Sequence, residues 1–140
     1  MSNICNEKKK DFLRGYRRAQ YELKVAEEKL EEYNTSILYP STLYDKAPTK
    51  KGHKSDLSKY MGKLNDLKNE CIKKRYKAIV KAGEVERCIN ELECDRERKV
   101  LFLRYVRLKK WEEICVEVGY SWKQTHRIHG RALVNLIIKR

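Results

Sequence analysis

The fold of this 140-residue chain is decided by residues 111–133, Trp-Glu-Glu-Ile-Cys-Val-Glu-Val-Gly-Tyr-Ser-Trp-Lys-Gln-Thr-His-Arg-Ile-His-Gly-Arg-Ala-Leu. Their spacing predicts a short helix, a tight turn over 119–121 and a second, longer helix. Gly119 is placed to end the first helix, because a residue without Cβ adopts the left-handed conformation at little cost. Ser121 is placed to cap the second helix, and Gln124 three residues later can complete a capping box.

Each of these two helices has an inner and an outer side. Ile114 and Val118 lie four residues apart and share the inner face of the first helix. In the second helix, over 121–138, the residues expected to face inward are Thr125, Ile128, Ala132, Leu133, Leu136 and Ile137. The opposite face carries Trp122, Lys123, His126, Arg127 and Gly130. A buttressing helix followed by a helix with a polar, basic outer face is the arrangement of a helix–turn–helix DNA-binding motif.

The same stretch, extended upstream, resembles region 4 of sigma-70-type transcription factors. The resemblance rests on residues 98–106, Arg-Lys-Val-Leu-Phe-Leu-Arg-Tyr-Val, followed by residues 111–119. These follow the family pattern V-L-x-L-R-Y, a short turn, and W/Y-x-E-I-A-x-x-L-G. The ending, Ser121 and then Arg-Ile-His-x-Arg-Ala-Leu at 127–133, is closer to small sigma-region-4-like regulators of phages and prophages, the RinA and ArpU groups. The resemblance covers roughly residues 95–138, about a third of the chain.

The sequence departs from the family pattern at two places. The turn before Trp111 usually carries glycine and then Leu-Ser, whereas this chain has Leu108, Lys109 and Lys110. The alanine that usually follows Glu-Ile is Cys115, a small change in volume. The first departure removes the expected glycine stop and serine cap, so a less sharply defined entry into the helix at Trp111 is expected.

The resemblance implies which residues would contact double-stranded DNA. The positions that match the family's base-contacting residues are Trp122, Lys123, His126 and Arg127. Arg127 is the best base-edge candidate, because a guanidinium can bond guanine O6 and N7 together. The residues expected to contact phosphates and fix the register are Arg104, Lys109, Lys110 and Arg131. Two alternatives stay open. The four expected phosphate contacts could instead be solvated surface charges, and Trp122 could instead pack within the chain over Tyr120.

Composition supports a helical, nucleic-acid-binding protein. The chain has 6 Gly and 2 Pro, and 38% of its residues are charged, which favours long helices over strands. Residues 95–140 hold twelve basic and five acidic residues, so +7 of the net charge of +13 lies on the predicted motif. Nucleic acid is the partner that such a basic segment suits best. The chain has no apolar run long enough to cross a bilayer and no signal-peptide pattern, so no membrane partner is expected.

The five cysteines lack paired Cys-x-x-Cys spacing. They are expected to be reduced thiols that act mostly as small hydrophobic residues. A zinc site built from Cys115, His126 and His129 would lack a nearby fourth ligand, so no metal and no other cofactor is expected. No paired carboxylates, phosphate-binding glycine loop or Cys/His dyad occurs at catalytic spacing, so no catalytic residue is assigned and the chain is not expected to be an enzyme.

The first 94 residues are predicted to form a long antiparallel helical hairpin, with helices over about 8–33 and 56–92 and a loop over 34–55. Apolar residues in the first helix follow a coiled-coil spacing of 4-3-4-3-4-3: Phe12, Tyr16, Ala19, Leu23, Ala26, Leu30 and Tyr33. The second helix has an apolar or small residue at every seventh position: Leu57, Leu64, Cys71, Ala78, Val85 and Leu92. Apolar loop residues such as Tyr39 and Leu43 are expected to fold back over the helices. The same seams leave open pairing between two chains as a homodimer.

The expected fold is therefore all-α, with a 1–94 helical hairpin followed by a three-helix, sigma region 4-like helix–turn–helix domain at 95–140, where Asp95 caps the first helix at 96–107. The expected function is sequence-specific DNA binding by a phage or prophage transcription regulator, with the 121–138 helix in the major groove near a promoter. The resemblance also implies contact with bacterial RNA polymerase and a location in the host cytoplasm, at the nucleoid. The alternative is a helical protein-interaction adaptor that uses the N-terminal hairpin.

Overall fold

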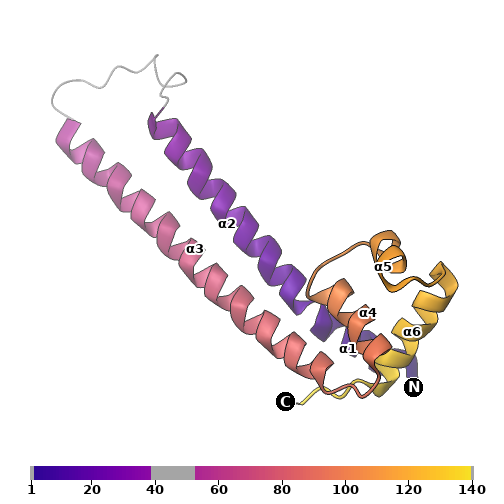
Figure 1. The fold of residues 1–140 in the computed structure, drawn as a ribbon. Helices are drawn as coiled ribbons and strands as arrows, with labels where there is room; N and C mark the ends of the chain where they lie inside the picture. The colour runs from indigo at the N-terminus through magenta and orange to yellow at the C-terminus, as the bar shows by residue number, and fades with distance from the viewer. Residues whose placement is uncertain (1, 39–52, 140) are drawn as a thin grey trace. The chain divides into compact units, whose positions relative to one another are not determined.

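The computed structural model describes residues 2–38 and 53–139, and in these residues the chain is all helical, as the sequence predicts (Figure 1). The described residues contain no strand. The helices are α1 (Ser2–Leu13), α2 (Gly15–Leu38), α3 (His53–Asn90), α4 (Asp95–Tyr105), α5 (Trp111–Val118) and α6 (Trp122–Asn135). No helix in the described part of the chain has the length and apolar character needed to span a membrane.

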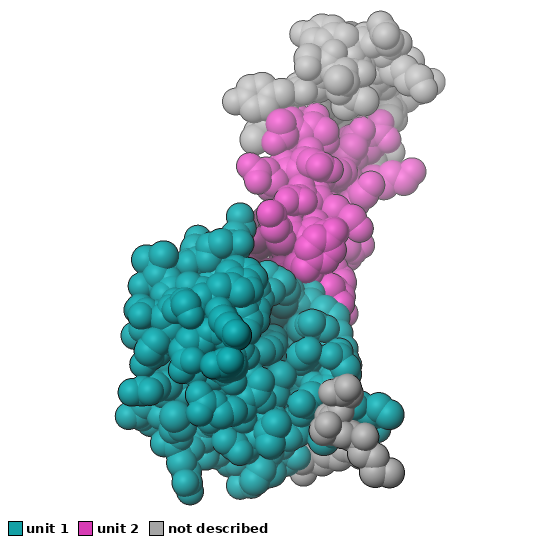
Figure 2. Space-filling model, turned by 90° about the vertical axis from the view of Figure 1, so that its right-hand side faces the viewer, with its two compact units in different colours: residues 1–19, 78–140 teal, residues 20–77 magenta. Residues whose placement is uncertain are grey.

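The chain forms two compact units, coloured separately in Figure 2. Unit 1 consists of residues 1–19 and 78–140, and unit 2 consists of residues 20–77. The sequence-based division into 1–94 and 95–140 follows a different line from these units. Residues from both ends of the 1–94 segment share a unit with the C-terminal helices, because they contribute to the same hydrophobic core.

The core of unit 1 is built from four helices. Leu13 at the end of α1 and Val85 and Ile89 near the end of α3 are fully buried beside residues of α4 and α6. The full cluster is Leu13, Val85, Ile89, Leu92, Leu101, Tyr105, Ala132, Leu133 and Leu136. Three short helices alone would close only a marginal core, so α1 and α3 supply apolar surface that α4 and α6 need.

A single helix over 8–33 was predicted, but the structure has α1 and α2 with a break at Arg14. Gly15 follows the break, and a glycine inside a helix costs about 1 kcal/mol relative to alanine. Backbone hydrogen bonds from Arg14 N to Lys10 O (2.9 Å) and from Arg18 N to Arg14 O (3.1 Å) nevertheless bridge the break. The helical hydrogen-bond pattern therefore continues across the break.

The predicted loop over 34–55 is shorter in the structure, because 34–38 and 53–55 are helical. The predicted folding back of Tyr39 and Leu43 concerns residues that lie outside the described ones. The second predicted helix, 56–92, corresponds to α3, which begins at His53 and ends at Asn90.

In unit 2, α2 and α3 lie side by side and run in opposite directions (Figure 1). Leu23 and Ala26 of the predicted α2 seam and Cys71 of the α3 seam are buried. Ion pairs flank this contact: Glu22 accepts from Lys74 (3.2 Å) and Lys77 (3.1 Å), and Glu27 pairs with Arg75 (3.1 Å). Leu57 was expected in the seam but is 57% exposed, so the apolar seam does not include it.

The predicted N-cap of α4 is wrong by one residue. Cys94 occupies the N-cap position in an extended conformation, and Asp95 is the first residue of the helix, paired with Arg98. An acidic residue in the first turn still suits the positive end of the helix dipole. The helix ends at Tyr105 rather than at residue 107.

Candidate nucleic-acid interface

In the turn between α5 and α6, the predicted glycine end of α5 and serine cap of α6 are confirmed, and of the predicted capping box only the Ser121 half is present among the described residues. Gly119 ends α5 in the left-handed conformation (φ 75°), and its N–H donates to the Cys115 carbonyl (3.0 Å). Ser121 caps α6, where its Oγ accepts a hydrogen bond from Gln124 N (3.2 Å). The direction in which α6 leaves the turn is therefore fixed by local hydrogen bonds.

The turn before α5 replaces the missing glycine and serine in another way. Leu108 itself adopts the left-handed conformation (φ 56°), which a residue with a Cβ rarely takes. Lys110 is the N-cap of α5, and its backbone N–H donates to Glu113 Oε2 (2.9 Å). The Glu113 side chain, at the third position of the helix, thus caps the backbone N–H of the N-cap residue, which is one half of a capping box.

The inner face of α6 fixes which side of the helix faces outward. Thr125, Ile128 and Ala132 are buried, and Ile114 of α5 is also buried in unit 1. The prediction that Ile137 faces inward is wrong, since it is 68% exposed. Its helical spacing does not apply, because α6 ends at Asn135 and Leu136 is extended (φ −68°, ψ 129°).

Three of the predicted base-reading residues lie on the outer surface of α6. Lys123 and Arg127 are exposed, and Trp122 is 52% exposed. A shallow groove runs along this face between Gln124, Arg127, Gly130, Arg131 and Val134. These positions form one strip of the helix surface, because they repeat every three or four residues.

His126, the fourth predicted base-reading residue, is held differently. Its ring centroid lies 4.3 Å from that of Trp111 and 4.6 Å from that of Trp122. Its Nε2 is buried and has no hydrogen-bond partner among the described residues. The structure therefore places His126 within an aromatic cluster of tilted rings. It also gives Trp122 a ring partner other than Tyr120, which lies 5.7 Å from the Arg96 guanidinium.

The four predicted phosphate contacts divide into two pairs. Lys110 and Arg131 are exposed. Lys109 Nζ instead pairs with Glu117 Oε2 (2.6 Å), and this hydrogen bond lowers the pKa of the Glu117 carboxyl. Arg104 donates to the Lys109 carbonyl (3.0 Å), and its guanidinium carbon lies 4.9 Å from the Trp111 ring centroid. Lys109 therefore already has a charged partner within the chain, whereas Arg104 is held by a neutral carbonyl and an aromatic ring and has no carboxylate partner among the described residues.

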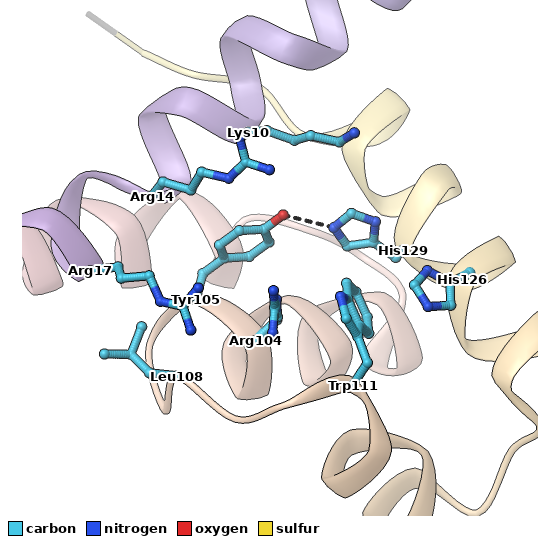
Figure 3. A pocket seen from close by; sticks show the side chains of 9 residues that line it. All are labelled: Lys10, Arg14, Arg17, Arg104, Tyr105, Leu108, Trp111, His126 and His129. Carbon is cyan, nitrogen blue, oxygen red and sulfur yellow. Dashed lines mark hydrogen bonds between the residues drawn. The ribbon is translucent and has the colours of Figure 1, made fainter.

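A pocket of about 210 Å³ in unit 1 contains residues that the sequence reasoning missed (Figure 3). Arg104 lines it together with Lys10 of α1, Arg14 at the helix break and Arg17 of α2. The spacing of 10, 14 and 17 places these three side chains on one helix face. That spacing was the available signal, but a basic helix face is usually solvated, and nothing local to residues 10–17 indicates that it meets α4.

Tyr105 and His129 line the inner side of the pocket, and a buried hydrogen bond joins their side chains. The Tyr105 hydroxyl lies 2.8 Å from His129 Nε2, and both residues are buried. Burial lowers the pKa of His129 to about 4, with nearby Lys10, His126, Arg104 and Arg14 acting in the same direction. Burial also raises the pKa of Tyr105. Both rings are therefore neutral near pH 7, and a neutral imidazole can accept the hydroxyl proton at Nε2.

No protein-family model, no curated protein and no solved structure matches this chain. No group of three or more potential metal ligands is present among the described residues, and all five thiols are free.

Proposed function

We propose that the chain is a sequence-specific DNA-binding transcription regulator of phage or prophage type. In this proposal α5 and α6 form a helix–turn–helix, α4 completes a three-helix domain like sigma region 4, and α2 and α3 form a helical hairpin. The α6 helix enters the major groove of a promoter-proximal site. Lys123 and Arg127 contact bases, and Lys110 and Arg131 contact phosphates.

The observation that carries the proposal is the two-sided character of α6. One side, with Thr125, Ile128 and Ala132, is buried in unit 1. The other side exposes Lys123, Arg127 and Arg131, and none of the three has a carboxylate within ion-pair distance in the described part of the chain. Long cationic side chains without internal partners are free to bind phosphates and base edges.

Gly130 supports contact with an external surface on this side of α6. It lies in the groove between Arg127 and Arg131, and a Cβ built there would meet no atom within 4 Å. Packing within the chain therefore does not require glycine, although glycine in a helix interior costs about 1 kcal/mol relative to alanine. A glycine at this position would allow the DNA backbone to approach the helix closely, because no side chain lies in between.

The proposal extends to partners. A single helix–turn–helix reads few base pairs, so specificity calls for a second binding contribution. A homodimer or contact with bacterial RNA polymerase would supply it, and either would operate at the nucleoid of the host cytoplasm.

Selection of bound sequences from random duplex DNA at ~150 mM salt tests the proposal, because nonspecific phosphate binding is weak there. The proposal predicts an enriched motif. A palindromic motif would identify a dimer, and a short asymmetric motif would favour a monomer beside RNA polymerase. Absence of enrichment would overturn sequence-specific binding.

A second candidate function is a protein-interaction adaptor that uses α2 and α3. The observation that favours it is a pair of large apolar side chains one turn apart on α3, Ile72 (62% exposed) and Tyr76 (71% exposed). A second copy of the chain would bury them. If so, changing both to serine would abolish self-association in sedimentation experiments and leave DNA binding by the monomer intact.

A further inference from the structure

The pocket lined by Lys10, Arg14, Arg17 and Arg104, called here the cationic pocket, has an excess of positive charge. No aspartate or glutamate lines it among the described residues. Lys10 pairs with Glu7 (2.9 Å), but no described carboxylate lies within ion-pair distance of Arg14 or Arg17. A hollow lined by charges of one sign concentrates the electrostatic potential and attracts ions of the opposite sign.

The guanidinium groups gather around the Tyr105 ring from different helices (Figure 3). Arg14 lies at the break between α1 and α2, Arg17 is in the first turn of α2, and Arg104 comes from α4. Arg104 is held by its bond to the Lys109 carbonyl and by the Trp111 ring, so its position is fixed before any ligand binds. Burial lowers the pKa of Arg104, and the nearby positive charges of Arg17 and Arg14 act in the same direction.

The groups that line the cationic pocket favour an anion that can accept several hydrogen bonds. The Tyr105–His129 pair is neutral and buried, so the inner side of the pocket carries no negative charge that would repel an anion. Guanidinium groups bind phosphate oxygens with two parallel hydrogen bonds, which a single halide cannot use. Trp111 of α5 and His126 of α6 add two aromatic rings to the pocket lining.

We propose that the cationic pocket binds a phosphate group through Arg14, Arg17 and Arg104. The phosphate belongs either to the DNA backbone or to a free phosphorylated small molecule. The proposal goes beyond DNA reading by α6, because it assigns a separate site with residues from α1, α2 and α4. It holds or fails whether or not α6 reads a base sequence.

The first test uses inorganic pyrophosphate as the probe on the full chain. The Trp111 indole N–H signal is followed by NMR at constant ionic strength, so that general screening does not change during the titration. Saturable binding is expected for the wild type and at least a tenfold weaker affinity for the double variant Arg14→Gln/Arg17→Gln. Both arginines are exposed, so the double variant is expected to fold.

Arg18→Gln is the matched control. Arg18 lies on the same helix but pairs with Asp11 (2.7 Å), and it does not line the pocket. The control removes one positive charge nearby and should leave pyrophosphate binding unchanged within about twofold. An equal loss per arginine in the control and the double variant would overturn the assignment, because only overall charge would then matter.

A duplex titration separates the two sources of phosphate. If the DNA backbone supplies it, the double variant weakens binding to all duplexes, reduces the salt dependence by up to about two counterions, and duplex displaces pyrophosphate. If a free ligand supplies it, the double variant loses pyrophosphate binding and keeps wild-type duplex affinity. Wild-type behaviour of the double variant towards both probes would overturn the proposal, whatever motif α6 selects.

Discussion

The two compact units differ in how their helices are held together. Unit 1 contains fully buried large side chains, among them Leu13, Ile89 and Leu101. In unit 2 the described buried hydrophobic residues are Leu23, Ala26 and Cys71, and exposed ion pairs flank them. Buried apolar area contributes far more stability than exposed ion pairs. Unit 1, which carries α6, is therefore expected to be the more stable part of the molecule, and unit 2 is expected to open more easily.

The largest effect is expected from truncating the core of unit 1. Leu101→Ala should lower the free energy of unfolding by about 3 kcal/mol, because it leaves a cavity among fully buried neighbours. Leu64→Ala, the matched change at a half-buried position of α3 in unit 2, should cost less than about 1.5 kcal/mol. Urea unfolding followed by circular dichroism measures both. Equal losses would contradict the contrast between the units.

Acid should weaken unit 1 through His129. The folded-state pKa of His129, about 4, lies below the ordinary value of 6.5, so the unfolded chain takes up a proton first as pH falls. Stability from this group is full above about pH 6.5 and is lost progressively towards pH 4, by about 3 kcal/mol in all. His129→Gln should flatten this part of the stability profile. An unchanged slope between pH 6.5 and 5 would show that His129 is not the group responsible.

Arg127 and Lys110 should separate base reading from phosphate binding. Arg127→Ala is expected to lower affinity for the selected duplex by ~1–3 kcal/mol and to relax preference at one base position. Lys110→Ala should weaken binding to all sequences and flatten the dependence on salt. Competition binding against single-base variants of the duplex measures both. An unchanged base preference in Arg127→Ala would remove that residue from the reading face.

Gly130→Ala should change stability and binding in opposite directions. The free energy of unfolding should rise by up to about 1 kcal/mol, because alanine favours the helix and the space is open. Affinity for DNA should fall, since the added methyl group would lie between Arg127 and Arg131. Gly83→Ala in α3, also in open space, is the control and should raise stability alone. Undiminished DNA binding by Gly130→Ala would argue against close approach at this point.

The smallest effect is expected in unit 2, from Glu22→Gln. The hydrogen bond from Lys77 and then that from Lys74 lower the pKa of Glu22, but the carboxyl remains in contact with solvent. The variant should have a slightly lower melting temperature at low salt and the wild-type value near 1 M salt, where such pairs are screened. A loss that persists at high salt would mean that Glu22 supports packing rather than charge pairing.

The sequence predicts local features of this molecule better than distant ones. Gly119 and Ser121 end and begin helices through hydrogen bonds to residues within four positions, so their roles could be predicted. The inward face of α6 followed from helical spacing until the helix ended, and Ile137 lies just beyond that point. These features depend on short stretches of chain.

The cationic pocket could not be predicted in the same way. It combines Arg14 and Arg17 with Arg104, about ninety residues away, and spacing along the chain does not report such contacts. The aromatic cluster around His126 depends in the same way on Trp111 of a different helix. Sequence spacing placed His126 on the outer face, but a long-range contact determines what its ring touches.

The most direct test of the DNA-binding proposal is an NMR titration of the full chain with the duplex that selection enriches. If α6 binds DNA, the largest amide shifts are expected in α6, at Lys123, Arg127 and Arg131, while residues 20–77 change little. Shifts confined to residues 20–77, with α6 unaffected, would contradict DNA binding by α6 and make α2 and α3 the functional surface.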